Sequence, residues 1–206
     1  MLNALRSRWW ENRRRPIVLD DRQFQHVALL IDSSSFEVFR PRARFEESKM
    51  YYDKKNGMYA IKKEIAVMAS SPHFALFSSK GFIGSQHDYL HFKENYSTYL
   101  EYLKKTAEEK RTLIDAHPFW SVCQDMGYIG PVSDAPEIRR IIPNKFPKST
   151  EEKKTNEQIN KLRVPVECFF GLLKSLWKIT NVRYGFTLIK FNSYTFLCSK
   201  SSIILF

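Results

Sequence analysis

A short, uninterrupted apolar run that stops at a carboxylate is the feature that most constrains the fold of this chain. Residues 27–31 read VALLI, and Asp32 follows directly. A continuous apolar segment of this length is typical of a strand that is buried on both faces. Residues 58–69 (MYAIKKEIAVMA) carry apolar side chains at most alternate positions, which predicts a second strand. Together the two segments indicate a sheet at the centre of the fold.

The pattern changes along the middle of the chain. Residues 73–85 predict a third strand or a hairpin that ends at a Gly-Ser pair. From Asp88 onward, aromatic and leucine residues recur at helical spacing, so a helix is expected there. Residues 119–125 (FWSVCQD) and 138–143 (IRRIIP) then predict two more strands.

The last part of the chain predicts a loop, a helix and an apolar tail. Residues 144–161 are charged and are expected to form a long, mobile loop. Residues 163–179 place apolar side chains on one helical stripe, with Pro165 tolerated in the first turn. The tail is interrupted by lysine and asparagine, which argues against a membrane span and favours a buried pair of strands.

This order of elements predicts an α/β fold, namely a ribonuclease H-like mixed sheet flanked by helices. The expected organisation is a basic leader at residues 1–25, a ribonuclease H-like domain at residues 26–185 and the apolar tail at residues 186–206. A hydrophobic fraction of 43% is enough to bury a sizeable core and excludes a disordered polymer.

The charge balance and the cysteines narrow the kind of partner and compartment. Lysine and arginine outnumber aspartate and glutamate by 33 to 22, a net charge of +11. This excess favours a polyanionic partner, because each neutralised phosphate releases condensed counterions. Three scattered cysteines form neither a disulfide framework nor a Cys-x-x-Cys zinc site, which favours a reducing compartment.

Three acids stand at positions where ligands gather in α/β folds. Asp32 and Asp125 each end a predicted strand, and Glu167 lies in the first turn expected for the last helix. Carboxylates held on rigid elements are the hard oxygen ligands that a pair of Mg²⁺ ions requires. The alternative is that Asp32 is a turn residue and that Asp125 begins a tight Asp-Met-Gly-Tyr turn.

Several short motifs occur in a fixed order between residues 29 and 177. They read LLIDSSS, MYYDKKNGMYAIKKEIAV, GSQHD, QDMGYIGP, IIPNK and RVPVECFFGLLK. In this order they resemble the landmarks of the PIF/Harbinger family of DDE transposases. The resemblance implies a DDE catalytic domain that cuts and joins DNA phosphodiesters.

The resemblance also implies a two-metal site. Asp32, Asp125 and Glu167 would be the catalytic and metal-binding acids, holding two Mg²⁺ or Mn²⁺ ions about 4 Å apart. Asp88 of the GSQHD motif competes with Asp125 for the second position. Asp125 is preferred because it ends a strand, whereas Asp88 is expected to cap a helix and to support the site or face the substrate.

The implied partners are DNA, further copies of the chain assembled on DNA ends, and a Myb-like accessory protein, with action in the nucleus and no membrane. Lys174 lies seven residues, two helical turns, beyond Glu167 and therefore on nearly the same face. The basic residues expected to contact the DNA backbone are Lys54, Lys55, Lys62, Lys63, Arg163 and Lys174.

The sequence also departs from the family pattern. Ser33 stands where the family usually has glycine, Pro165 interrupts the approach to Glu167, and no helical DNA-binding segment is evident in residues 1–25. These departures raise the hypothesis of a truncated or domesticated copy that binds DNA or protein without catalysis. A ribonuclease H-like hydrolase acting on RNA fits the acids but not the ordered motifs.

Overall fold

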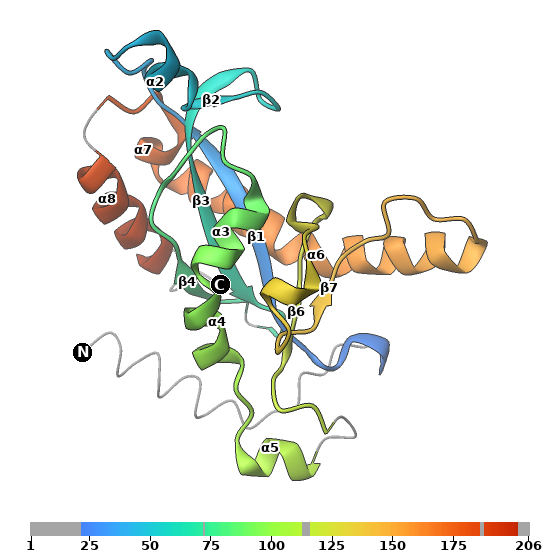
Figure 1. Cartoon of the computed structure of the whole chain (residues 1–206). Helices are drawn as coiled ribbons and strands as arrows, with labels where there is room; N and C mark the ends of the chain where they lie inside the picture. The colour runs from blue at the N-terminus through green and yellow to red at the C-terminus, as the bar shows by residue number, and fades with distance from the viewer. Residues whose placement is uncertain (1–21, 72, 113–115, 186–187, 202–206) are drawn as a thin grey trace.

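The described part of the chain forms one mixed sheet with helices on both faces (Figure 1). The computed structural model describes residues 22–71, 73–112, 116–185 and 188–201. The strands are β1 (Val27–Glu37), β2 (Tyr52–Asp53), β3 (Met58–Met68), β4 (Ala75–Ser78), β5 (Phe82–Ile83), β6 (Ser121–Cys123) and β7 (Arg140–Ile141). The α-helices are α2 (Phe45–Lys49), α3 (Asp88–Glu94), α4 (Tyr96–Leu103), α5 (Ala107–Thr112), α6 (Thr150–Leu176), α7 (Lys178–Asn181) and α8 (Leu188–Ser201). Short 3₁₀ turns are η1 (Arg22–Phe24), η2 (Met126–Tyr128) and η3 (Val132–Asp134).

The strand order confirms the predicted mixed sheet flanked by helices, which is compatible with a ribonuclease H-like fold. The sheet runs β2–β3–β1–β6–β7, and β4 and β5 also pair with β3. β1 and β3 are antiparallel, whereas β1, β6 and β7 are parallel to one another. Residues 73–85 therefore form two short strands that each pair with β3.

From Leu29 to Ile31, successive side chains of β1 enter two separate cores. Leu30 belongs to the core covered by α6 and α8, together with Phe169 and Phe191. Leu29 and Ile31 face the other side, where they pack with α3 and α4. Helices cover both faces of β1, and residues 27–31 are buried. This confirms the strand buried on both faces that the apolar run predicted.

β1 is longer than its apolar run. The strand continues through Glu37 and stays paired with β3 along residues 33–37. The sequence prediction ended this strand at Asp32 because SSS reads as a polar turn, but pairing with the long β3 keeps the backbone extended. Asp32 therefore lies within β1, at the point where the burial of its side chains decreases.

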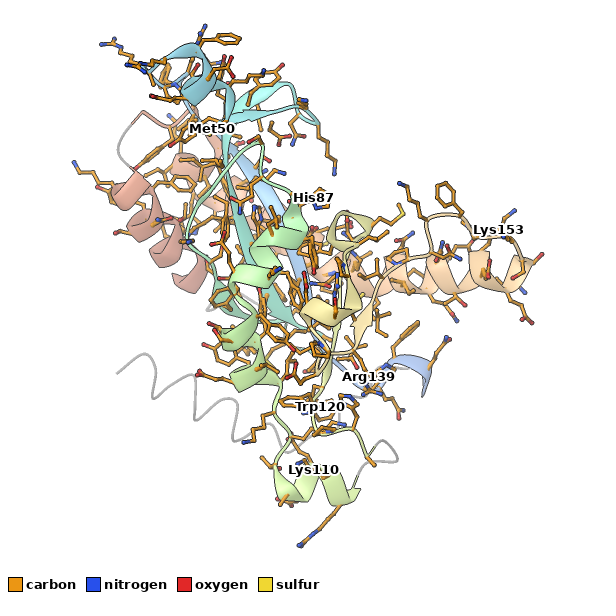
Figure 2. All side chains as sticks on the ribbon, in the orientation of Figure 1. Met50, His87, Lys110, Trp120, Arg139 and Lys153 are labelled. Atoms are coloured by element: carbon orange, nitrogen blue, oxygen red, sulfur yellow. The ribbon has the colours of Figure 1, made fainter. Side chains whose placement is uncertain are left out.

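The predicted mobile loop at residues 144–161 is wrong for residues 150–161, because α6 begins at Thr150. Ser149 and Glu152 form a capping box that satisfies the first free N–H groups of this helix. With 27 residues α6 is about 40 Å long. Its first turns extend beyond the sheet (Figure 1), and Lys153 marks this projecting part in Figure 2.

The early start of α6 also corrects the positions of two residues near its middle. Pro165 and Glu167 were expected in a first turn, but both lie in the interior of the helix. Pro165 has no N–H to donate to the carbonyl of Lys161, so the helix lacks one backbone hydrogen bond just before Glu167.

The predicted strand pair near the carboxyl end is also wrong, because residues 188–201 form α8. Phe191 is fully buried, and the Thr195 hydroxyl donates to its carbonyl at 2.7 Å. Burial at positions 191, 195 and 198 follows a helical spacing that the apolar composition of the segment concealed. The basic leader up to residue 21 and residues 202–206 lie outside the described residues.

Candidate active site

Asp32 and Asp125 are neighbours because their strands are parallel and in register. Leu30 of β1 pairs with Cys123 of β6, and each aspartate follows its paired residue by two positions. Asp125 lies directly beyond the end of β6, where its side chain accepts a hydrogen bond from the Gly127 N–H and caps η2. The turn reading of Asp125 is therefore correct as local structure, and the same turn holds its carboxylate beside Asp32.

Glu167 approaches from α6, which packs on the face of the sheet that Asp32 also occupies. The Nη2 atom of Arg163 lies 3.3 Å from Asp32 Oδ2, 3.8 Å from Asp125 Oδ2 and 3.5 Å from Glu167 Oε1. The three acids predicted from the sequence are thus brought together around one guanidinium group. Arg163 is 10% exposed and Glu167 is 54% exposed, so the cluster opens to solvent on the Glu167 side.

Asp88 lies on the other side of Asp125. A β-carbon added to Gly127 would lie 2.9 Å from both Asp125 Oδ1 and Asp88 Oδ2, so the glycine separates the two carboxylates. Asp88 is the first residue of α3 and not its cap, because His87 is the N-cap and its side chain accepts a hydrogen bond from the Tyr89 N–H. The Oδ1 atom of Asp88 lies 3.3 Å from Lys62 Nζ. Asp88 therefore has its own cation, whereas Asp125 shares Arg163 with the other two acids.

Burial and like-charge repulsion raise the pKa of two of these carboxyls, those of Asp32 and Asp88. Burial, the largest cause, raises the pKa of Asp32 to about 6, although Arg163 and the Ser33 N–H favour the charged form. Asp125 and Asp88 raise the pKa of Asp32 further by like-charge repulsion. Burial also raises the pKa of Asp88, against the attraction of Lys62. A group of acids with this need for positive charge is typical of cation-binding sites.

A hydrogen-bonded cluster beneath the acids was missed by the sequence reasoning. The Ser33 hydroxyl lies 2.8 Å from the Tyr128 hydroxyl and 3.2 Å from His91 Nδ1. Each member stands close to an acid in sequence: Ser33 follows Asp32, while His91 and Tyr128 come three residues after Asp88 and Asp125. This spacing was the available signal, and Ser33 had been read only as a departure from the family pattern.

Glu64 extends this cluster into the protein interior. It is fully buried in β3, and its Oε1 accepts hydrogen bonds from the Tyr99 hydroxyl at 2.7 Å and Asn95 Nδ2 at 2.9 Å. Burial raises the pKa of Glu64 to about 7, opposed by hydrogen bonds from Tyr99, Asn95 and Tyr128. Tyr128 therefore influences both Ser33, beside Asp32, and Glu64.

The residues expected to contact DNA separate into distinct groups. Lys54 and Lys55 are exposed in the turn between β2 and β3. Lys174 reaches back from α6 toward β1, with its Nζ 3.3 Å from the carbonyl of Ser35. These three lysines remain compatible with a role at a DNA backbone.

Three other expected DNA contacts are engaged inside the protein. Lys62 pairs with Asp88, and Arg163 pairs with the acid cluster. Lys63 is 2% exposed, and its Nζ lies 3.4 Å from the Ser78 hydroxyl. Because β3 alternates its side chains between two faces, the neighbours Lys62 and Lys63 cannot share one surface. We therefore remove the buried Lys63 from the expected DNA-contact set.

The donor set fits a divalent cation in charge and chemistry. Carboxylate oxygens are the ligands that Mg²⁺ and Mn²⁺ prefer. The carboxylates of Asp32, Asp125 and Glu167 converge on one cationic nitrogen, Nη2 of Arg163. As they stand, no three His, Cys, Asp or Glu side chains in the described ranges are grouped closely enough to hold a metal ion. The acids are arranged around Arg163 instead.

The mixed sheet places one acid within β1, a second just beyond β6 and a third on the covering helix α6. This arrangement is that of an α/β domain compatible with a ribonuclease H-like fold. The chain matches the DDE superfamily endonuclease family over residues 31–199. It therefore belongs to that family, which indicates a transposase or nuclease function and binding to DNA. Searches of curated proteins and of solved structures each found no match. Within the described residues, no helix combines the length and apolar character needed to cross a membrane.

Proposed function

We propose that this chain is the catalytic domain of a DNA transposase that cuts and joins phosphodiesters with two divalent ions. The observation that carries the proposal is the convergence of Asp32, Asp125 and Glu167 on one cationic nitrogen, from two parallel strands and a helix. Belonging to the DDE superfamily endonucleases supports the same reaction class. Asp32, Asp125 and Glu167 would hold the Mg²⁺ or Mn²⁺ ions.

Each part of the site has a distinct task in this reaction. When bound, the ions supply the positive charge that activates water and stabilises the leaving 3′ oxygen. Asp32 is the most deeply placed of the three acids and is oriented by the Ser33 N–H at 2.8 Å. Glu167 faces solvent, where a DNA strand arrives. A freed 3′-OH then attacks a phosphodiester of a second DNA strand in the same site. The new P–O bond joins the two strands while the attacked phosphorus loses its bond to its own 3′ oxygen, which leaves as a 3′-OH.

The finer identity and the partners follow from the ordered motifs. We assign the chain to the PIF/Harbinger type, which acts on DNA in the nucleus and uses Mg²⁺ or Mn²⁺ as its cofactor. It assembles with further copies of itself on DNA ends, and a Myb-like protein reads the DNA sequence. The motifs GSQHD and QDMGYIGP support this assignment, because their aspartates meet on either side of Gly127.

The alternative is an inactive relative that binds DNA or protein. The observation that favours it is Arg163, which satisfies all three acids without any metal ion. The two functions differ in their response to Mn²⁺, because only the catalytic domain gains stability by binding it.

A thermal melt with and without Mn²⁺ tests the proposal. We expect Mn²⁺ to raise the melting temperature of the native chain, since an ion at 100 times its Kd adds about 2.7 kcal/mol of stability. Asp32→Asn should lose this response and the Mn²⁺-dependent nicking of DNA, because a neutral amide cannot offset the charge of two adjacent ions. Glu157→Gln, at an exposed position of α6, is the matched control and should behave as the native chain. An equal response in Asp32→Asn and the native chain would favour the inactive alternative.

A further inference from the structure

Arg163 is held almost entirely by the acid cluster. Its Nη2 atom lies within 4 Å of three carboxylates that come from three different elements. Its Nε atom is buried and has no hydrogen-bond partner. A guanidinium carries five donors, so a buried one without a partner at Nε is poorly satisfied. Arg163 is therefore fixed by charge rather than by a complete set of hydrogen bonds.

The acids need this charge as much as Arg163 needs them. Asp32, Asp125 and Glu167 would face one another as three unpaired carboxylates if the guanidinium were absent. A partly buried group of like charges destabilises the fold, and Arg163 offsets that repulsion. Glu167 is one helical turn beyond Arg163, so both side chains extend from the same face of α6.

A divalent ion would need the same carboxylate oxygens. Ligand distances to Mg²⁺ are about 2.1 Å, much shorter than the separations from Arg163 Nη2. Binding would therefore draw the acids inward, and a guanidinium nitrogen cannot stay at their centre without steric and electrostatic conflict. In this arrangement the three acids surround Arg163. Among the described side chains, no three His, Cys, Asp or Glu residues lie close enough together to hold a metal ion.

We propose that Arg163 is an internal counter-ion that keeps the three acids paired in the metal-free protein, and that a divalent ion enters only as its guanidinium leaves. The proposal rests on the proposed function, because it concerns the metal site of that reaction. Arg163 acts here as a positioning residue. It keeps Asp32, Asp125 and Glu167 near their binding arrangement, at the cost of weaker affinity for the ion.

Calorimetric titration with Mn²⁺ tests this exchange on the full chain. Arg163→Gln removes the competing charge and should bind Mn²⁺ at least about tenfold more tightly than the native chain, a modest effect for charges separated by about 4 Å. Lys161→Gln is the matched control, because it removes one positive charge from an exposed position of the same helix. Its affinity for Mn²⁺ should equal that of the native chain. The metal-free Arg163→Gln protein should also melt at a lower temperature and recover when Mn²⁺ is added.

A measurement on the native chain keeps the test independent of how well the variant folds. Phenylglyoxal modifies accessible arginines, and peptide mass spectrometry locates the product. Arg163 is 10% exposed in the cluster, so its modification should be slow without ions and several-fold faster with Mg²⁺. Arg183, which pairs with Glu37 at an exposed position, should react at the same rate in both conditions.

The outcomes separate this inference from the proposed function. Equal or weaker Mn²⁺ binding by Arg163→Gln, with binding by the native chain, would overturn the inference and leave the proposed function intact. Unchanged or slower modification of Arg163 in Mg²⁺ would also overturn it. Mn²⁺ binding by Arg163→Gln alone would support the counter-ion and contradict catalysis by the native chain. Binding by neither protein would overturn both.

Discussion

At the scale of single residues, Glu64 couples the stability of the fold to pH. The ordinary pKa of this carboxyl is 4.5, and burial raises it to about 7 in the folded protein. Between these values the folded state keeps a proton that the unfolded state releases. The contribution of Glu64 to the unfolding free energy therefore falls as the pH rises from 4.5 to about 7.

Replacing Glu64 by glutamine should remove this part of the pH dependence. Each unit of pKa shift corresponds to about 1.4 kcal/mol, so the native chain should lose stability more steeply than Glu64→Gln across this window. Urea unfolding at several pH values between 4.5 and 8 measures the difference. Glu157→Gln, an exposed acid, should follow the native curve. Parallel curves for the native chain and Glu64→Gln would contradict the prediction.

Gly127 lies between the carboxylates of Asp125 and Asp88, where a side chain would collide with both. An added methyl group would lie 2.9 Å from oxygens of both Asp125 and Asp88, so one carboxylate must move. We expect Gly127→Ala to reduce the stabilisation by Mn²⁺ in a thermal melt. Gly171→Ala is the control, because its methyl would meet nothing within 4 Å on the exposed side of α6.

The control carries its own expectation. Alanine in an exposed helix interior should stabilise the protein by about 0.5–1 kcal/mol relative to glycine, with an unchanged response to Mn²⁺. If Gly127→Ala and Gly171→Ala responded alike to Mn²⁺, the spacing of Asp88 and Asp125 would have no bearing on ion binding.

At the scale of elements, the two halves of α6 are stabilised differently. Residues 150–158 of α6 include no buried side chain, whereas Val166, Phe169 and Leu173 are almost completely buried. Tertiary packing therefore holds the second half, and the first half depends on helix propensity and its cap. This division matters to the site because Arg163 and Glu167 lie in the packed half.

Removal of the cap should act locally. Ser149→Ala deletes the side chain that accepts from the Glu152 N–H at 3.1 Å, a loss of about 1 kcal/mol of helix stability. We expect faster amide hydrogen exchange in the first turns of α6 and little change at Phe169 and Leu173. Ser175→Ala, near the other end of α6, should leave exchange in the first turns unchanged. A uniform increase along the helix would contradict this division.

At the scale of the whole molecule, a net charge of +11 should make DNA binding depend strongly on salt. The logarithm of affinity falls with the logarithm of salt concentration by about 0.9 for each neutralised phosphate. Lys54→Gln and Lys55→Gln should each lower this slope by about 1 in fluorescence anisotropy titrations with duplex DNA. Lys110→Gln is the control, because Lys110 lies at the opposite end of the molecule from Met50 (Figure 2). The strand β2, which leads into the turn of Lys54 and Lys55, lies at the Met50 end (Figure 1). An equal change of this slope in all three variants would mean that the net charge of the protein, and not these particular lysines, sets its affinity for DNA.

Local sequence patterns were enough to predict the elements whose apolar and polar residues follow one regular pattern. The apolar run at residues 27–31, the alternation at residues 58–69 and the Asp-x-Gly-Tyr turn each depend on neighbouring residues alone. They predicted the central strands and the acids Asp32 and Asp125. The start of α6 was missed although Ser149 and Glu152 carried its signature, because the charged composition was read as a loop.

Tertiary structure decided what depends on residues far apart in the chain. α8 is a helix because Phe191 and Cys198 find a core on its inner side, although its composition reads as strands. Lys63 is buried and Lys62 is paired because β3 is covered on both faces. Arg163 meets Asp32 across 131 residues, and only the packing of α6 on the sheet brings them together. The sequence by itself determined which side chains carry charge; the fold determined which charges meet, because Coulomb energy depends on distance in space and on burial.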